Sequence, residues 1–349
     1  MDSHKLLTAD FDEVFADSAS LWEHFRGARV FLTGGTGFFG SLLVESLLWA
    51  NARFSLGAQA VILTREPGAF ARRRPWVARA SALQLFAGDV RDFAFPAGQF
   101  SHVIHAAAPV AQAGDPLVLA ETIVVGTARV LEFARARGVG RLLLTSSGAV
   151  YGRQPAELPH LHEDYGGAPD PTDPRSIYAQ SKRHAECLGA VYAAKYGIEI
   201  SIARCFAFVG PYLPLDAQFA IGNFIRDALA GGPLKLQGDG TPQRSYLYGS
   251  DLSAWLWTLL ARAGGGRAYN VGSGTAYSIL DVAREVARVI CPSARIDVRK
   301  TPVPGSAPER YVPSVERAEA EFGLLQTVGL AEAIRRTARW HAMEGGSSS

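Results

Sequence analysis

A tyrosine and a lysine stand four residues apart in the segment "SIYAQSK", at Tyr178 and Lys182. Side chains at this spacing share one face of a helix. An ammonium group beside a phenol stabilises the phenolate and lowers a pKa that starts near about 10. The pair could therefore let a tyrosine act as an acid or a base near neutral pH. The same spacing also occurs by chance on helix surfaces, so the interpretation needs further residues.

Further residues lie upstream, in "LLLTSSGAVYG". The apolar run at 141–147 predicts a buried strand, and Ser147 stands at its carboxyl end, where α/β sheets carry their sites. The Ser147 hydroxyl could hold a substrate oxygen while Tyr178 moves the proton. A nicotinamide on the other side would exchange a hydride with the same carbon. For the neighbouring Ser146, a strand-end hydroxyl without a direct role is the favoured interpretation.

A glycine-rich turn near the start of the chain could bind the dinucleotide. In "VFLTGGTGFFGSLLVESLL" the spacing G-x-x-G-x-x-G is formed by Gly34, Gly37 and Gly40. Glycine permits the tight turn and lets backbone N–H groups approach a pyrophosphate at a helix N-terminus. The alternative is a strand–helix turn without a ligand. The turn follows an apolar strand and opens a helix, which is the context that favours a dinucleotide site.

The end of the next strand bears on which dinucleotide is bound. An acidic residue there would bind the ribose 2′-OH of NAD. In "VILTREPGAFARRR" Thr64 stands at that place and Arg65 follows it. A guanidinium suits a 2′-phosphate, so the sequence favours NADP, with NAD as the alternative. A solvated basic loop is the structural alternative.

Two further residues are assigned to the cofactor half. Asp89 in "AGDVRD" is a candidate adenine contact, or else a turn aspartate. His105 in "HAAA" is interpreted as shaping the cofactor turn rather than acting as a base.

The elements that must position these residues form a repeating pattern. Apolar strands are predicted at 29–33, 60–64, 83–88, 102–108, 141–147 and 199–206, with helices between them. Such alternation predicts an α/β fold, a doubly wound parallel Rossmann sheet covered on both faces.

The chain is predicted to have two main parts. Residues 27–206 form the dinucleotide-binding Rossmann domain. The proline- and glycine-rich sequence of 207–343 predicts a smaller α/β lobe that binds substrate in the crevice at the strand ends. Residues 1–26 are interpreted as an N-terminal leader with a short helix, and 344–349 as a flexible tail.

Composition excludes several classes of protein. The 349 residues carry a formal net charge of +2, which gives no reason to expect nucleic acid or an anionic membrane as partner. No window is apolar for the length of a membrane span, and the start does not resemble a secretory signal. Three scattered cysteines form no disulfide framework, and "HLHED" at 160–164 is interpreted as a polar loop without metal. A cytoplasmic enzyme is expected.

Taken together, "TGGTGFFG", "GDV", "HAAA", "TSSGAVYG" and "YAQSK" resemble the extended short-chain dehydrogenase/reductase superfamily, in its nucleotide-sugar epimerase/dehydratase branch. The likeness runs from about residue 28 to 324. The segment 161–186 is most similar to UDP-glucuronate decarboxylases and dTDP-glucose 4,6-dehydratases. The resemblance implies a nucleoside-diphosphate sugar as substrate and often a homodimer, formed through the helices near 117–137 and 177–196.

The resemblance also implies which residues form the site. Ser147, Tyr178 and Lys182 would be catalytic. Substrate contacts would come from Ser147, Gly148, Asn223, Leu236, Arg244 and Arg310. Cofactor contacts would come from Gly34, Thr36, Gly37, Phe38, Phe39, Gly40, Thr64, Arg65, Asp89, Val90, Ala106, Ala107, Ala108, Tyr178 and Lys182.

The chain departs from those relatives where their acids stand. The dehydratases have Thr-Asp-Glu before "VYG", and the decarboxylases have a Glu directly before it. Here Ser147, Gly148 and Ala149 occupy these places, so no carboxylate is available there. The pattern is nearer to the "SSSATVYG" of the 4-epimerases. The departure weighs against elimination and decarboxylation by the relatives' mechanisms.

Three functions remain open from the sequence. The first is a nucleotide-sugar epimerase or reductase that exchanges hydride at a sugar carbon, expected to be C4. The second is a dehydratase or decarboxylase that takes its acid from elsewhere, such as Glu163 or Asp164. The third is a non-catalytic dinucleotide sensor, which the intact Tyr178, Lys182 and Ser147 argue against.

Overall fold

A parallel sheet of seven strands forms the centre of the computed structural model, which describes residues 3–108 and 114–346. Every neighbouring pair in this sheet is parallel. The predicted doubly wound α/β fold is therefore confirmed. Across the sheet the strands lie in the order β11 (Arg267–Val271), β6 (Glu199–Cys205), β5 (Arg141–Ser147), β4 (His102–His105), β1 (Arg29–Thr33), β2 (Gln59–Thr64) and β3 (Leu83–Ala87).

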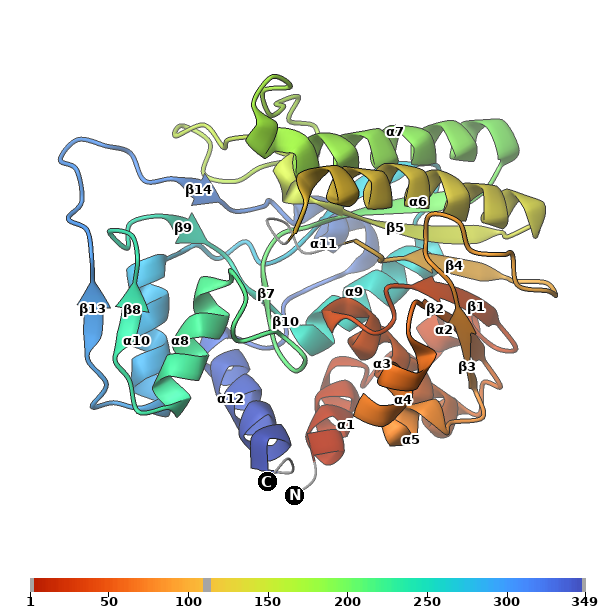
Figure 1. Ribbon diagram of the computed structural model, residues 1–349, viewed down its shortest axis with the longest axis horizontal. Coiled ribbons are helices and arrows are strands. Elements are labelled where there is room, and N and C mark those ends of the chain that lie inside the picture. The colour runs from red at the N-terminus through yellow and green to blue at the C-terminus, as the bar shows by residue number, and fades with distance from the viewer. Residues whose placement is uncertain (1–2, 109–113, 347–349) are drawn as a thin grey trace.

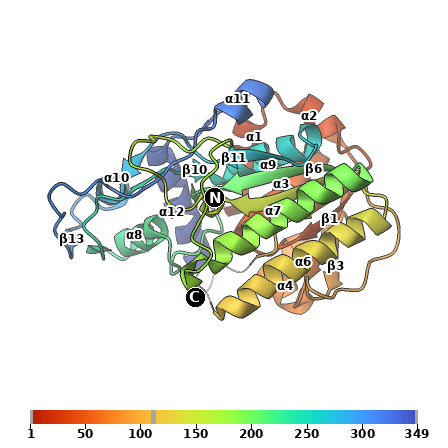
Figure 2. The same cartoon turned by 90° about the horizontal axis from the view of Figure 1, so that it is seen from above.

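Helices cover both faces of the sheet (Figures 1 and 2). Two long helices, α6 and α7, lie side by side on one face, and the other helices lie on the opposite face or beyond its edge. Because both faces are covered, the central strands are apolar along most of their length. The helices of this part are α1 (Ser3–Val14), α2 (Ala19–Glu23), α3 (Phe38–Phe54), α4 (Pro67–Arg73), α5 (Pro75–Ala78), α6 (Pro116–Ala136), α7 (Ile177–Tyr196) and α9 (Gly249–Arg262).

Local signals explain where the two long helices begin and end. The Asp115 carboxylate accepts a hydrogen bond from the Leu117 backbone N–H at 2.8 Å and caps α6, with Pro116 at its first position. Helix α7 ends at Gly197, which adopts a left-handed φ of 69°. These caps fix the start of α6 beside the strand ends and the length of α7 across the sheet.

The smaller lobe contains short elements, many of only two or three residues. It is built around α8 and α10, with α12 packed against both, and lies to the left in Figure 1. Its elements are β7 (Phe208–Val209), α8 (Ala220–Leu229), β8 (Leu234–Leu236), β9 (Gln243–Arg244), β10 (Leu247–Tyr248), β12 (Tyr277–Ser278), α10 (Ile279–Ile290), β13 (Ile296–Val298), β14 (Arg310–Tyr311) and α12 (Leu330–Gly346). Helix α11 (Glu316–Phe322) instead packs against β11 at the edge of the large sheet.

Residues 207–343 do not belong to the smaller lobe alone. They also supply α9 to the face of the large sheet and β11 to its edge, where β11 pairs with β6. This strand was not predicted, because five residues in a glycine-rich context give too short a pattern to recognise. The chain thus crosses between the lobes repeatedly, which ties the substrate lobe to the sheet.

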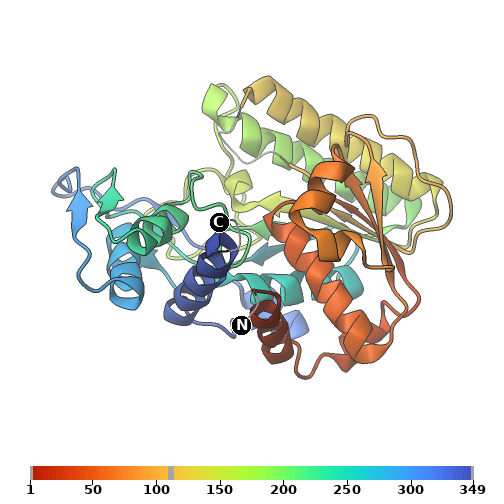
Figure 3. The same cartoon turned by 60° about the horizontal axis from the view of Figure 1, so that its bottom comes forward.

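The first helices pack into the molecule. Phe11, Phe15, Trp22 and Phe25 are fully buried, and Phe15 stacks on Trp49 of α3 with ring centroids 5.3 Å apart. Helices α1 and α12 lie side by side, so the two described ends of the chain are near one another (Figure 3). At the other end, α12 extends to Gly346, and residues 347–349 of the predicted tail lie outside the described residues.

Candidate active site

Tyr178, Lys182 and Ser147 meet at the carboxyl end of β5. Ser147 is the last residue of that strand, and α7 carries the other two on the face turned to it. The Lys182 ammonium is buried and donates a hydrogen bond to the Thr145 carbonyl at 2.8 Å. The Ser147 hydroxyl can stabilise the Tyr178 phenolate, and it accepts a hydrogen bond from the Ala149 backbone N–H at 3.1 Å. The structure thus brings the three predicted residues together.

Burial controls the protonation of this group. Loss of solvent lowers the pKa of Lys182 to about 8, since an ammonium is poorly solvated in the interior. Burial also raises the pKa of Tyr178, and the hydrogen bond from Ser147 partly opposes this by stabilising the phenolate. Both groups therefore titrate away from their ordinary ranges, which is common at functional sites.

The three glycines of the turn differ in whether the fold itself requires a glycine at that position. Gly34 adopts a φ of 74°, and a methyl group there would lie 2.5 Å from the Ala106 carbonyl oxygen. Gly40 packs against the backbone of Gly34 and Gly35. At Gly37 a methyl group would meet no atom nearer than 3.5 Å, and the φ of −85° suits any residue. The chain's own packing therefore does not require Gly37, which fits a backbone surface left open for a pyrophosphate.

A buried histidine holds the cofactor turn to the neighbouring strand. His105 Nδ1 lies 2.8 Å from the Thr33 hydroxyl, and its Nε2 lies 3.0 Å from the Thr127 hydroxyl on α6. Thr33 in turn accepts a hydrogen bond from the Ala107 N–H at 3.2 Å. Burial lowers the pKa of His105 to about 3, so the ring is neutral. His105 thus positions the "AAA" turn.

The candidate adenosine end of the site lies beyond β2. Thr64 is half-buried at the strand end, and its hydroxyl accepts a hydrogen bond from the Glu66 N–H at 3.3 Å. Arg65 is exposed, and its charge helps to lower the pKa of Asp89 after the larger effect of Arg91. The ion pair between Asp89 and Arg91, at 2.8 Å, fixes the adjacent loop.

The basic residues that follow differ in their surroundings. Arg72 and Arg73 are exposed on α4. Arg74 instead lies over the Tyr212 ring, 4.4 Å from its centroid, and pairs with Glu344 of α12 at 3.3 Å. Arg74 therefore joins the cofactor half to the C-terminal helix.

The remaining predicted cofactor residues line or support the turn. Phe39 packs edge-on against Phe208 with centroids 5.0 Å apart, and Phe38 contacts Phe39 at 5.5 Å. Val90 is buried, while Thr36, Ala106 and Ala108 are partly exposed. An aromatic layer thus supports the helix start from the side of the smaller lobe.

A polar network lies beneath the candidate catalytic group. The Ser146 hydroxyl donates to Glu186 at 2.5 Å, and Glu186 pairs with Arg204 at 2.7 Å. Arg204 donates to the Tyr151 hydroxyl at 3.0 Å, and Tyr151 donates to the Asn270 side chain at 2.7 Å. The network links β5, α7, β6 and β11, and it gives Ser146 the structural role that the sequence favoured.

Glu163 and Asp164, the alternative acids, are engaged elsewhere. The Glu163 carboxylate is 4% exposed, accepts a hydrogen bond from the Asn270 N–H at 2.9 Å, and lies 3.8 Å from Arg317. Asp164 pairs with Arg317 at 2.6 Å and is 87% exposed. Both carboxylates hold the loop to β11 and α11.

The predicted substrate residues fall on different surfaces of the smaller lobe. Arg244 on β9 pairs with Glu309 at 2.6 Å. Leu236 is buried in the core of the lobe, so its side chain packs within the protein. The Asn223 side-chain oxygen on α8 accepts a hydrogen bond from Arg226 at 3.2 Å.

Arg310 and Tyr311 are neighbours on β14, so their side chains point to opposite faces of the small sheet. Tyr311 pairs in register with Arg244, whose guanidinium lies 5.9 Å from the Tyr311 ring centroid. Of the two predicted arginines, Arg244 therefore shares the face that carries Tyr311.

Tyr311 itself was not predicted as a site residue. Its hydroxyl lies 3.5 Å from the Ser147 hydroxyl, and its ring packs on Phe206 with centroids 4.6 Å apart. A methyl group on Gly148 would lie 2.7 Å from both the Tyr311 oxygen and Phe206 Cζ. The space for a side chain at position 148 is thus filled. Only the adjacency of Tyr311 to the family-position residue Arg310 could have drawn attention to it.

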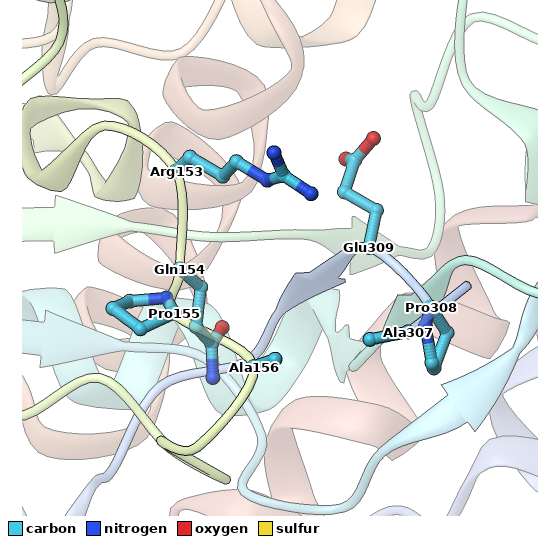
Figure 4. Close-up of a pocket in the computed structure, with 7 residues that line it drawn as sticks. All are labelled: Arg153, Gln154, Pro155, Ala156, Ala307, Pro308 and Glu309. Atoms are coloured by element: carbon cyan, nitrogen blue, oxygen red, sulfur yellow. The ribbon is translucent and has the colours of Figure 1, made fainter. Parts of the chain in front are cut away.

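A cavity of about 240 Å³ lies between two loops next to this point. One loop, 153–156, follows the turn that carries Ser147, and the other, 307–309, precedes β14 (Figure 4). Arg153 and Glu309 point toward one another from opposite sides. The cavity is bordered by the two segments that bring Ser147 and Tyr311 to the site.

Two features are absent from the part of the chain that the structure describes. No cluster of three or more His, Cys, Asp or Glu side chains with the arrangement of a metal site occurs in residues 3–108 and 114–346. Within the same ranges, no helix is long and apolar enough to cross a membrane.

The parallel sheet, the glycine turn and the Tyr/Lys/Ser group define a dinucleotide-dependent enzyme of the short-chain dehydrogenase/reductase type. The chain belongs to the NAD dependent epimerase/dehydratase family, which it matches over residues 30–272. A curated relative, UDP-glucuronic acid decarboxylase 6 of Arabidopsis thaliana, is 32% identical over 88% of this chain and 86% of the relative.

Solved structures agree with this assignment. A crystal structure of UDP-galactose 4-epimerase matches with a TM-score of 0.71 and 28% identity, covering 90% of this chain and 99% of that one. The UDP-glucose 4-epimerase of Thermus thermophilus, in complex with NAD, matches with a TM-score of 0.72 and 29% identity, covering 91% and 99%. The predicted nucleotide-sugar branch of the superfamily is thus confirmed.

Proposed function

We propose that the protein is a nucleotide-sugar epimerase or reductase that exchanges hydride at a sugar carbon, C4 by analogy with the 4-epimerase structures. One observation carries the proposal. Tyr178, Lys182 and Ser147 lie together at the end of β5. The dehydratases have an aspartate at the position of Gly148, but here Tyr311 and Phe206 occupy the space that its side chain would need. Position 149, the place of the relatives' glutamate, is an alanine. Such a site can move a proton and hold an oxygen, but it lacks a carboxylate for elimination.

Each residue has a distinct role in this reaction. Tyr178 removes the proton from the sugar hydroxyl during oxidation, or returns it to the ketone oxygen during reduction. The Lys182 charge favours the phenolate, and Ser147 holds the reacting oxygen. The nicotinamide, when bound, supplies or accepts the hydride. Oxidation followed by reduction on the other face gives an epimer, while reduction of a 4-keto sugar is the one-way alternative.

The cofactor we propose is NADP, with NAD as the alternative. Thr64 gives β2 no terminal carboxylate for a ribose 2′-OH, and the exposed Arg65 beside it suits a 2′-phosphate. The related Thermus structure contains NAD, so membership of the family does not favour NADP over NAD. Mass spectrometry of the nucleotide that copurifies with the protein distinguishes the two.

The substrate we propose is a nucleoside-diphosphate sugar held by the smaller lobe. The names of the relatives give UDP sugars. Arg244 lies on the same face of the small sheet as Tyr311, and an arginine there suits a diphosphate. Asn223 and Arg310 are proposed as further contacts of the nucleotide, and Leu236 as a support beneath the base.

The test is turnover with UDP-, dTDP-, CDP- and GDP-sugars, followed by the reduced-nicotinamide absorbance and by chromatography of the sugar. Net loss of NADPH identifies a reductase, and a changed sugar without net loss identifies an epimerase. Tyr178→Phe should lower kcat at least about 100-fold while the cofactor dissociation constant stays within about twofold. Unchanged turnover by this variant would remove Tyr178 from the mechanism.

A second candidate is decarboxylation of a UDP-uronate, favoured by the identity to UDP-glucuronic acid decarboxylases. Oxidation at C4 would create a β-keto acid, which can lose carbon dioxide without a protein acid. Release of carbon dioxide from UDP-glucuronate would establish this candidate. Glu163→Gln removes the carboxylate but keeps an oxygen that can accept the hydrogen bond from Asn270, so a loss of activity in this variant would indicate a direct role of the Glu163 acid.

We also propose a homodimer. Leu117, Val118 and Val125 on α6 and Val191 and Tyr196 on α7 are exposed apolar side chains on the outer helices. Exposed apolar surface of this kind is typical of an interface between subunits.

A further inference from the structure

Three hydroxyl groups converge at the candidate active site. Ser147 and Tyr178 come from the Rossmann sheet and its helix, whereas Tyr311 comes from β14 of the smaller lobe. The Tyr311 oxygen lies 3.5 Å from the Ser147 oxygen and 3.5 Å from the Cys205 carbonyl oxygen. Tyr311 is thus within reach of the reacting centre but is not part of the recognised Ser/Tyr/Lys group.

The contact between Tyr311 and Ser147 affects which hydrogen bonds the Ser147 hydroxyl can form. A serine hydroxyl has one proton and two acceptor lone pairs. One lone pair accepts from the Ala149 N–H at 3.1 Å. The Tyr311 hydroxyl has one proton and two acceptors at 3.5 Å, the Ser147 oxygen and the Cys205 carbonyl. If Tyr311 donates this proton to Ser147 rather than to Cys205, both lone pairs of Ser147 are filled, and the Ser147 proton points toward Tyr178 and the substrate oxygen.

We propose that Tyr311 is a positioning residue that donates a hydrogen bond to Ser147 and thereby makes Ser147 a donor to the phenolate and the sugar oxygen. The inference rests on the proposed hydride-exchange function, which it deepens. Tyr311 acts through Ser147 and transfers no proton itself.

The surroundings of Tyr311 fit this role. Burial raises the pKa of the Tyr311 hydroxyl, so it keeps its proton and can donate over the working pH range. The ring is held against Phe206, and Gly148 leaves room for the hydroxyl to approach. Register with Arg244 couples its position to the strand proposed to bind the diphosphate.

A double-mutant cycle tests the inference with the full-length, cofactor-saturated protein. We expect Tyr311→Phe to lower kcat about tenfold with little change in KM, the size of one lost neutral hydrogen bond. Ser147→Ala should lower it further, and Ser147→Ala/Tyr311→Phe should be no slower than Ser147→Ala alone. Multiplicative losses, or full activity of Tyr311→Phe, would overturn the inference.

A second measurement needs no substrate. The ring-carbon NMR signal of Tyr178, assigned by its loss in Tyr178→Phe, reports the pKa of this residue. Tyr311→Phe should raise that pKa, and it should raise it no further when Ser147 is already alanine. An identical titration in the wild type and in Tyr311→Phe would contradict the inference. If Tyr311→Phe shifts the pKa of Tyr178 but the protein turns over no nucleotide sugar, the proposed function is wrong. The proposed hydrogen bonds from Tyr311 through Ser147 to Tyr178 are then still supported.

The matched control is Tyr277→Phe. Tyr277 pairs with Arg244 from β12, on the other side of the same small sheet. This variant loses the same hydroxyl group at a position outside the proposed relay. Tyr277→Phe should leave kcat and the pKa of Tyr178 unchanged. Equal thermal unfolding midpoints for Tyr277→Phe and Tyr311→Phe would exclude a general loss of structure in Tyr311→Phe.

Discussion

At the scale of single residues, the candidate site contains a positively charged side chain, Lys182, that is buried away from solvent. Lys182 is 5% exposed, and its ammonium donates a hydrogen bond to the Thr145 carbonyl. A buried ammonium with a neutral partner destabilises the folded state. In the proposed mechanism the Lys182 charge acts on Tyr178, so its burial would be a stability–activity compromise of the kind typical of active sites.

This compromise makes stability depend on pH. The unfolded chain keeps the Lys182 proton up to about 10.5 and the folded protein only up to about 8. The unfolded state therefore binds more protons between these values, and wild-type stability should rise with pH there. Cofactor-free Lys182→Met should be more stable at pH 7 by about 2 kcal/mol, after allowance for the lost hydrogen bond.

Urea unfolding at several pH values measures this difference. The advantage of Lys182→Met should narrow as the pH is raised from about 8 to about 10.5. Lys182→Arg, which keeps a cation, should gain no stability. Parallel stability curves for the wild type and the methionine variant would contradict the assignment.

At the scale of elements, the β1–α3 turn separates glycines that fold the chain from a glycine left free for a ligand. Gly34→Ala forces a methyl group into the Ala106 backbone at a positive φ, so we expect a loss of stability of more than about 2 kcal/mol. Gly37→Ala meets no close atom and should change stability by less than about 1 kcal/mol.

Cofactor titration completes this comparison. Gly37→Ala should weaken NADPH or NADH binding at least about tenfold, because its methyl group lies on the surface that approaches the pyrophosphate. Thermal unfolding without cofactor and fluorescence titration with it measure the two effects separately. Normal affinity in Gly37→Ala would place the pyrophosphate elsewhere.

The same elements show what the sequence could predict. Six strands, the turn and the Tyr178/Lys182 face were predictable because each rests on local periodicity or spacing. Tyr311 was not, since the two-residue strand β14 and a hydroxyl contact between positions 147 and 311 depend on tertiary pairing. Likewise, Arg72, Arg73 and Arg74 are consecutive in the sequence, but only the first two are exposed, because Arg74 packs on Tyr212.

At the scale of the whole molecule, α6 and α7 form an outer layer that carries exposed apolar side chains. Val118 and Val125 are two helical turns apart and so lie on one face of α6, and Val191 is 51% exposed on α7. A stable dimer through this layer would bury them and would brace α7, which carries Tyr178 and Lys182.

Light scattering with size-exclusion chromatography tests the dimer. Val191→Glu would place a charge in the buried seam and should shift the protein to the monomer mass. Val303→Glu is the control, because Val303 is 66% exposed and lies between β13 and β14 of the smaller lobe, outside α6 and α7. A monomeric wild type, or a dimer that survives Val191→Glu, would contradict the proposed surface.

The filled space at Gly148 also constrains how this chain could change its chemistry over evolutionary time. An acid at position 148 would collide with the tips of the Tyr311 and Phe206 side chains, so it would require these rings to move. A smaller residue at position 206 or 311 would make this space in advance, and at position 311 it would weaken the proposed reaction before a new one existed. The order of substitutions, rather than their number, would set the route from this protein to a dehydratase.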